Sequence, residues 1–254
     1  MKKTILAVSV LVFSMGFSTL ALSCDMSREI EKELSVGNLT DIRVEAGAGE
    51  LLIKGVDTVG QVSLVAKLCA PNDDVLADMD VSTILDDEIV SIGTRIPRTG
   101  GDYSSPTIDL ELLVPSTAIL DVKDSSGDVE IKKVASLSLF DSSGDIFIKN
   151  ITGMVKVSDS SGDLQMHKIG SAQVSDSSGS IQVSKVQDDF IVEVDSSGDI
   201  EVDKVGGNVL VKVDSSGSIE VQDVAGAFTV EKDGSGKIKH RDVLGDVSIP
   251  DRKK

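Results

Sequence analysis

Apolar and polar residues alternate in short runs that recur along the second half of the chain. Each run follows an Asp-Ser-Ser-Gly turn motif and places apolar residues two and four positions after the glycine, with a mostly polar residue between them. A period of two is typical of a strand with one buried face. Another apolar residue follows seven positions after the glycine, and a second short strand, such as 208–213, leads to the next turn. This pattern therefore predicts that each repeat forms two short strands and two turns.

The spacing of the turn motif defines the repeat. Its leading aspartates are separated by 17, 18, 17, 19, 19 and 19 residues, and the last copy is degenerate. They are Asp124, Asp141, Asp159, Asp176, Asp195, Asp214 and Asp233. A fixed period near 20 residues indicates a solenoid, whose coils bury their apolar faces only by stacking. We predict an all-β protein: a parallel β-solenoid of about 17–19 residues per coil, with two sheets and equivalent positions paired in register.

One change of register is expected within the stack. Ahead of the first four turns, an apolar residue of the returning strand lies two positions before the aspartate, whereas ahead of the last three it lies three positions before. One inserted residue reverses the face to which side chains point, unless a β-bulge absorbs it. We therefore predict bulges that begin near Val194.

Residues 24–117 are predicted to form divergent coils and an irregular N-terminal cap, in one continuous domain with the regular repeats of 118–254. The segment 42–56 follows the pattern of the later coils, with Ala-Gly-Ala-Gly in place of Asp-Ser-Ser-Gly, and 62–66 would be its returning strand. Residues 28–36 suggest an edge strand. Such a cap would cover an open sheet edge that otherwise invites edge-to-edge self-association.

Residues 1–23 have the features of a signal peptide. Two lysines precede an apolar run, and Ala-Leu-Ser at 21–23 fits a small-residue cleavage site. The run is short and would be removed, so we expect no membrane span in the mature chain. These features predict an exported protein of the bacterial periplasm or cell surface.

The only two cysteines, Cys24 and Cys69, allow two interpretations. Two cysteines in an exported chain favour a disulfide between them. Alternatively, the residues around the cleavage site resemble a lipoprotein box, although Ala21 occupies the place where leucine is usual, and Cys24 would then carry a lipid anchor.

The chain is strongly acidic. Its formal net charge is −17, and without residues 1–23 it has 23 basic and 42 acidic side chains, a net charge of −19. This balance argues against nucleic acid and anionic membrane surfaces as partners. The same negative charge would also keep a repeat protein soluble by opposing self-association.

The segment 110–115, Leu-Glu-Leu-Leu-Val-Pro, and the following 120–129, which contains the first turn motif, resemble the bacterial adhesin-like β-solenoid domains, a family of unknown function. The resemblance extends from about residue 42 to 249. It implies the solenoid fold and an adhesin-like role, but no catalytic residues, because fold alone does not fix function.

The column of leading aspartates is the obvious candidate site. A divalent cation would relieve repulsion between stacked carboxylates, but so would an Asx turn, in which the carboxylate accepts a backbone N–H two residues on. The trailing position of the motif holds Ser180, Ser218 and Lys237 in place of aspartate. A column of metal ions that bridges successive coils would not readily tolerate these replacements. We interpret the leading column as a structural turn ladder and assign no metal, cofactor-binding or catalytic residue.

Two functions of different class remain open. The first is a non-enzymatic envelope scaffold or binding module with an unknown envelope or surface partner. The alternative is a β-helix polysaccharide-active enzyme, a lyase or hydrolase. Such an enzyme usually offers aromatic platforms to sugars, and residues 24–254 contain no Trp, one Tyr and four Phe. His167 and His240 are the only histidines, and no histidine recurs with the serine pairs of the turns.

Overall fold

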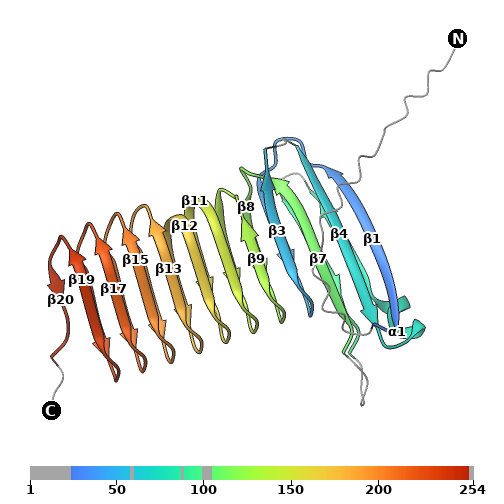
Figure 1. Ribbon diagram of the computed structural model, residues 1–254. Helices are drawn as coiled ribbons and strands as arrows, with labels where there is room; N and C mark the ends of the chain where they lie inside the picture. Colours follow the sequence, from blue (N-terminus) through green and yellow to red (C-terminus); the bar gives the residue numbers. More distant parts are fainter. Residues whose placement is uncertain (1–23, 58–59, 87–88, 99–104, 252–254) are drawn as a thin grey trace, which may run out of the picture.

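A computed structural model describes residues 24–57, 60–86, 89–98 and 105–251. The predicted signal peptide, residues 1–23, lies outside the described residues. About 63% of the chain is in strands and 3% in helix, and the strands wind into a parallel β-solenoid of about 7 turns with about 19 residues per coil. The predicted fold class is confirmed (Figure 1).

Two sheets form the walls of the solenoid, because each coil contributes one strand, or one half of a long strand, to each wall. The first sheet contains β3 (Leu51–Val56), β9 (Val129–Lys132), the first halves of β11 (Ile146–Ser158) and β12 (Leu164–Asp176), β13 (Ile181–Val186), β15 (Ile200–Val205), β17 (Ile219–Val224) and β19 (Ile238–Val243). The second sheet contains β2 (Asp41–Glu45), β8 (Ile119–Lys123), β10 (Ser136–Phe140), the second halves of β11 and β12, β14 (Phe190–Asp195), β16 (Val209–Asp214), β18 (Phe228–Asp233) and β20 (Val247–Ser248). All of these pairings are parallel.

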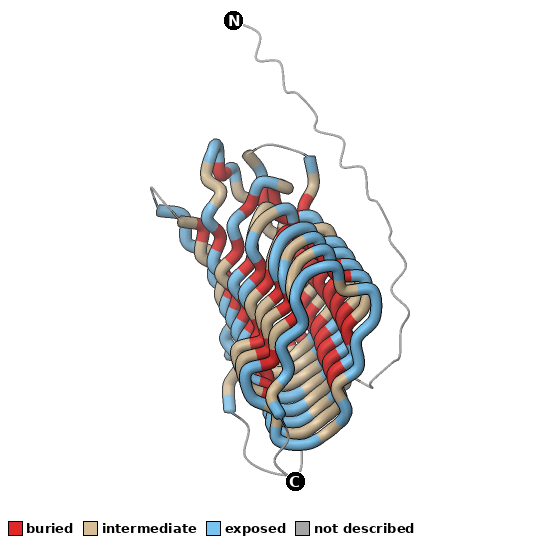
Figure 2. Tube along the Cα trace, turned by 90° about the vertical axis from the view of Figure 1, so that its left-hand side faces the viewer, coloured by how far each residue is buried: buried red, intermediate tan, exposed pale blue. Residues whose placement is uncertain are grey.

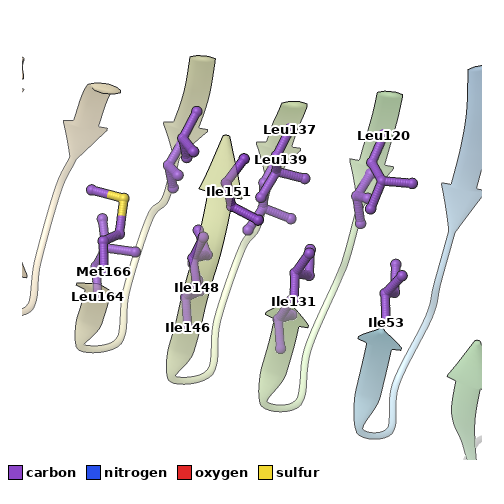
Figure 3. Packing of buried hydrophobic residues seen from close by; sticks show 14 of the residues in the cluster. Ile53, Leu120, Ile131, Leu137, Leu139, Ile146, Ile148, Ile151, Leu164 and Met166 are labelled. Atoms are coloured by element: carbon purple, nitrogen blue, oxygen red, sulfur yellow. The ribbon is translucent and has the colours of Figure 1, made fainter. Parts of the chain in front are cut away.

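The core is a set of ladders of like residues between the two walls. Positions two and four after each turn glycine point inward, so that Ile53, Ile131, Ile148 and Met166 stack from coil to coil (Figure 3). Buried positions form continuous stripes along the inside of both walls (Figure 2). Phe190 and Phe228 are fully buried, with Val209 between them in the ladder. Each apolar side chain therefore packs against its equivalents above and below.

The predicted bulge is present. Val174 pairs with Val192, but the next pair along is Ser175 with Val194, so that Glu193 is the additional residue of β14. The pairing of β14 with β16 again joins Val192 to Val211 and Asp195 to Asp214, because the following coil has the same length. The extra residue therefore shifts the register where 17- to 18-residue coils meet 19-residue coils. Another shift, between Ile151 and Met154, occurs earlier in the stack, where β11 pairs with β12.

The first coil of the stack comes from early in the chain. β2 and β3 are joined by the Ala-Gly-Ala-Gly segment and pair directly with β8 and β9, as the residue pattern of 42–56 predicts. The intervening residues leave the stack and form the cap. The chain returns at β7 (Thr107–Pro115), which pairs with the outer edge of β3.

The cap differs from the prediction in one strand. Residues 62–66 belong to β4 (Gln61–Ala70), which is not the returning strand of the first coil but runs antiparallel to β7. The strand beside β2 is instead β6 (Val90–Arg95), paired antiparallel with β5 (Asp80–Leu85). An alternating pattern marks a strand without fixing its direction, and outside the repeat nothing in the sequence specifies its partner.

β1 (Met26–Ser35) pairs antiparallel with β4 and, in the part of the chain that the structure describes, with no other strand, as expected for an edge strand.

The helix α1 (Asp73–Asp78) follows β4 and is capped by Asn72, whose side chain accepts the N–H of Val75. None of the described helices is long and apolar enough to cross a membrane. A disulfide joins Cys24 to Cys69, with 5.6 Å between their Cα atoms, and ties the start of β1 to the end of β4.

The disulfide gives a stability prediction. The Cys69→Ser variant is expected to lose about 2–4 kcal/mol of unfolding free energy, because the 45-residue loop between the cysteines is no longer closed in the unfolded chain. Thermal melting of oxidised and reduced protein measures the difference. Mass spectrometry of protein recovered from the envelope should find both thiols oxidised; free thiols, or a lipid on Cys24, would contradict the pairing.

Candidate binding faces and the turn column

The leading aspartates point into the solenoid rather than into solvent. From Asp124 to Asp214 each is only 0–4% exposed, while Asp233, in the last turn, is partly buried. The column therefore continues the apolar ladders at one corner of the core. The sequence places these residues at a turn, but it does not show which side of the turn their carboxyl groups face.

The backbone of the turn supplies hydrogen bonds to the carboxyl groups of Asp141, Asp159 and Asp176. Oδ1 of Asp159 accepts the N–H of Ser160 at 2.6 Å and that of Ser161 at 3.2 Å. Asp176 accepts the N–H of Ser178, whereas Asp141 accepts that of Ser142, the next residue. The bond two residues on, which defines the expected Asx turn, is thus present at Asp159 and Asp176.

Burial changes the protonation of the column. It raises the pKa of Asp124 to about 7, and the charge of Asp141 adds to the effect. Burial likewise raises the pKa of Asp195 to about 7, with repulsion from Asp214 and Asp176, and that of Asp159 to about 6. The pKa values of Asp141 and Asp176 are also raised, first by burial. A protonated carboxyl can donate a hydrogen bond to its neighbour, so a partly protonated column relieves its own repulsion without a cation.

The trailing aspartates have a different role, which the sequence pattern did not reveal. Oδ1 of Asp128 accepts the backbone N–H of Asp145 in the next coil, and Oδ1 of Asp145 accepts that of Asp163. Asp163 and Asp199 accept the N–H groups of Ser180 and Ser218 in the same way. The acceptor belongs to one coil and the donor to the next, so serine can replace aspartate in the donor coil. These residues join coils through their exposed side chains.

Metal binding finds no geometric support in the described residues, where no group of three or more His, Cys, Asp or Glu side chains could hold a metal ion. That the leading column is structural remains a prediction.

A groove crosses the outer face of the first sheet. It has a volume of about 500 Å³ and extends from β11 to β17. Its walls are two rows of outward side chains, one from each outward position of the strands. One row includes Gln165, Gln182 and Glu201, and the other includes Lys149, His167, Ser184 and Asp203. We call it the outer groove. It presents amide, hydroxyl, imidazole and carboxylate groups at the regular spacing of parallel strands, about 4.8 Å.

His167 and Ser184 contact each other in the outer groove. Nδ1 of His167 lies 2.8 Å from Oγ of Ser184. Partial burial, followed by the charges of Lys185, Lys149 and Lys168, lowers the pKa of His167. The paired residue on its other side is Lys149, not the carboxylate that orients a catalytic histidine. The pair fits hydrogen bonding to a ligand better than activation of a nucleophile.

A second column lies at the corner that follows the first sheet. Seven residues there have φ between 54° and 60°, the left-handed conformation: Lys133, Asn150, Lys168, Lys185, Lys204, Asp223 and Asp242. Sequence reasoning did not single out this column, although every member stands six positions after a turn glycine. Beside it lies a groove of about 730 Å³, the corner groove, lined by lysines of the column and by Thr152 and Gln187 over a buried floor that includes Ile151, Ile169 and Val186.

These features define the class of protein: a parallel β-solenoid whose coils are joined by aspartate-containing turns and whose outer face carries a polar groove. The chain belongs to the family described as Toastrack DUF4097, whose model matches residues 14–249. The resemblance noted from the sequence is thereby confirmed.

Several solved structures are similar to this chain. A putative adhesin from Bacteroides fragilis is 18% identical, with a TM-score of 0.42 over 87% of this chain and 96% of that one. A putative adhesin from Parabacteroides merdae is 11% identical, with a TM-score of 0.45 over 87% and 95%. A putative lipid binding protein from Parabacteroides distasonis is 13% identical, with a TM-score of 0.41 over 87% and 97%. No curated protein matches the chain.

Proposed function

We propose that the chain is a non-enzymatic, exported binding module of the bacterial envelope, and that its outer groove binds an extended ligand. The observation that carries the proposal is the continuity of the groove from β11 to β17. Equivalent side chains recur in it from one coil to the next. A ligand with a repeating structure can therefore make the same contact several times.

The rigidity of the wall favours this function. The floor of the groove is a parallel sheet whose inner face is fully buried at Ile181 and Ile200. A preformed surface loses little conformational freedom on binding, so weak contacts add up. The amides of Gln165 and Gln182, at paired positions, can each donate and accept hydrogen bonds, as sugar hydroxyls require.

Export is supported by the sequence of residues 1–23 and by the cysteine pair, because disulfides persist mainly in oxidising compartments. An envelope location also supplies extended polymers as ligands.

A binding screen against linear neutral and uronic-acid glycans, with calcium present, tests the proposal. We expect at least one polymer to bind without being cleaved. The Gln182→Trp variant should bind it about tenfold more weakly, the effect of losing contacts worth roughly 1.4 kcal/mol, because the indole would fill the groove. Ser138→Trp, on the exposed outer face of the second sheet, is the matched control and should bind as the parent does.

Turnover of any polymer would favour the polysaccharide-active enzyme instead. Equal losses in the two tryptophan variants would show that the ligand does not occupy the outer groove.

A further inference from the structure

The corner column contains lysines that its backbone conformation does not explain. Left-handed φ values favour Gly, Asn and Asp, whose short side chains tolerate or stabilise them. Asn150, Asp223 and Asp242 fit that preference, but four of the seven positions are lysine. In a chain with a net charge of −17, so regular a line of lysines calls for another reason.

The lysines form one continuous basic surface together with the adjoining row of the first sheet. Lys54, Lys132, Lys149 and His167 occupy paired positions on successive strands. Lys149 lies beside Asn150 of the corner column, and His167 lies beside Lys168. The pKa of Lys132 is lowered, first by burial and then by the charges of Lys149 and Lys54, which shows that these groups share one positive field.

The acidic side chains of the protein neutralise only the ends of this surface. Lys132 pairs with Glu130, and Lys133 pairs with Asp57 at 3.6 Å. At the other end, Lys204 pairs with Asp203 at 2.6 Å. Between them, Lys149, Lys168 and Lys185 form no ion pair with any carboxylate in the residues that the structure describes. These three lysines, on three consecutive coils, are the lysine track.

We propose that the lysine track binds a linear anionic glycan with one carboxylate per sugar, laid along the solenoid axis between the outer groove and the corner groove. This inference rests on the proposed function and names its ligand. The track offers one uncompensated charge on each of three consecutive coils, and Lys168 and Lys185, at equivalent positions, are one coil apart, about 4.8 Å. That spacing is close to the length of one sugar in an extended chain of uronic acids, so each carboxylate meets one ammonium group.

The groups beside the lysines suit sugar hydroxyls. Gln182 and Ser184 lie on the outer-groove side, and Thr152 and Gln187 lie on the corner-groove side. Ile151 and Ile169 form the buried floor beneath the corner groove.

Charge density favours this glycan over nucleic acid. Duplex DNA carries one negative charge per roughly 1.7 Å, which far exceeds one lysine per coil. Beyond Lys185 the same face carries Glu201, Asp203 and Glu220, so only a few sugars of a bound chain are in contact with the track.

Binding of polygalacturonate, a linear polymer of uronic acid, tests the proposal. Its methyl ester has the same chain without the charges and is the ligand control. The triple variant Lys149→Gln, Lys168→Gln, Lys185→Gln should bind polygalacturonate at least about tenfold more weakly at low salt, since several exposed charge pairs are lost together. The corresponding Lys→Arg triple variant should bind as the parent does, because it keeps the charges.

The matched control is Lys123→Gln, Lys156→Gln, Lys232→Gln, which removes the same charge from exposed positions on the second sheet. It should change binding less than about twofold. Melting temperatures check that each variant is folded.

Equal weakening in both glutamine variants would overturn the proposal, as would equal affinity for the methyl ester. Tighter binding of single-stranded DNA through the same lysines would overturn it in favour of nucleic acid. If the methyl ester binds and Gln182→Trp abolishes that binding, the outer groove remains a glycan site and only the lysine track fails. If no polymer binds at all, the proposed function fails with it.

Discussion

Replacement of Gly179 by alanine is expected to lower the melting temperature by about 10 °C or more, or to prevent folding. Gly179 has φ of +139°, which residues with a Cβ atom avoid. A Cβ there would also overlap the carbonyl oxygen of Gly162, the equivalent glycine of the preceding coil. Because backbone faces backbone, no side chain can move aside. We expect such strain to lower the free energy of unfolding by more than roughly 4 kcal/mol. Each kcal/mol shifts the melting temperature by about 2–4 °C in a chain of this size.

Gly93→Ala is the matched control for that variant. Gly93 lies in β6, has no left-handed φ, and its added Cβ would approach only Oγ of Ser82, at 3.2 Å. Its melting temperature should stay within a few degrees of the parent. If the two variants melt alike, the turn glycines are not in close contact and the stacking geometry described above is wrong.

The folded protein should lose stability as the pH rises from about 4 to about 7. Asp124 and Asp195 have folded pKa values near 7, above the ordinary 3.8, so the folded state binds more protons across that interval. Their contribution is complete below the unfolded pKa and is lost as the pH rises through the folded pKa. Chemical denaturation at pH 5 and at pH 8 measures the difference.

Asp195→Asn should remove part of this pH dependence. Asparagine removes the charge and keeps one acceptor, and its NH₂ group can donate to the neighbouring carboxyl groups. We expect the variant to gain about 1–2 kcal/mol at pH 8, less than the roughly 4 kcal/mol that three pKa units represent for an isolated group, because neighbouring carboxyls titrate as a coupled column.

Asp199→Asn serves as the comparison, since Asp199 is exposed and uses its Oδ1 to accept the N–H of Ser218. It should leave the pH profile as in the parent. A profile that is flat in the parent, or unchanged in Asp195→Asn, would show that the buried column does not titrate as inferred. A melting temperature that rises with millimolar calcium in the parent but not in Asp195→Asn would make the column a cation site.

The repeat made most of the solenoid predictable, because one physical rule applies at every coil. Apolar side chains two and four positions after the glycine must point inward, and the additional residue at Glu193 must bulge to preserve that. The cap follows no such rule. β4 alternates as β9 does, but only the three-dimensional structure shows that it pairs antiparallel with β1 and β7.

The candidate sites were less accessible to sequence reasoning, because they depend on contacts between coils. The bond from Asp128 to the N–H of Asp145 joins residues 17 apart and leaves no trace in either turn considered alone. Burial of Asp141 depends on the direction in which a turn folds. Two members of the lysine track, Lys168 and Lys185, had a signal, because each is the sixth residue after a turn glycine. That position follows no apolar pattern, and its role is evident only from the left-handed corner that these residues share.

The bonds of the trailing aspartates also bear on how such a molecule can change its length. In each of these bonds the side-chain Oδ1 of an aspartate in one coil accepts a backbone N–H of the next coil, and that donor can belong to aspartate or serine. Duplication of a coil that carries the aspartate would therefore leave the flanking junctions intact, provided that both neighbours share its residue count. Beyond the boundary at Glu193 the turns are evenly spaced by 19 residues, so the coils there meet this condition. Evolution can therefore lengthen or shorten this protein in steps of about 4.8 Å, as a molecular spacer of adjustable reach.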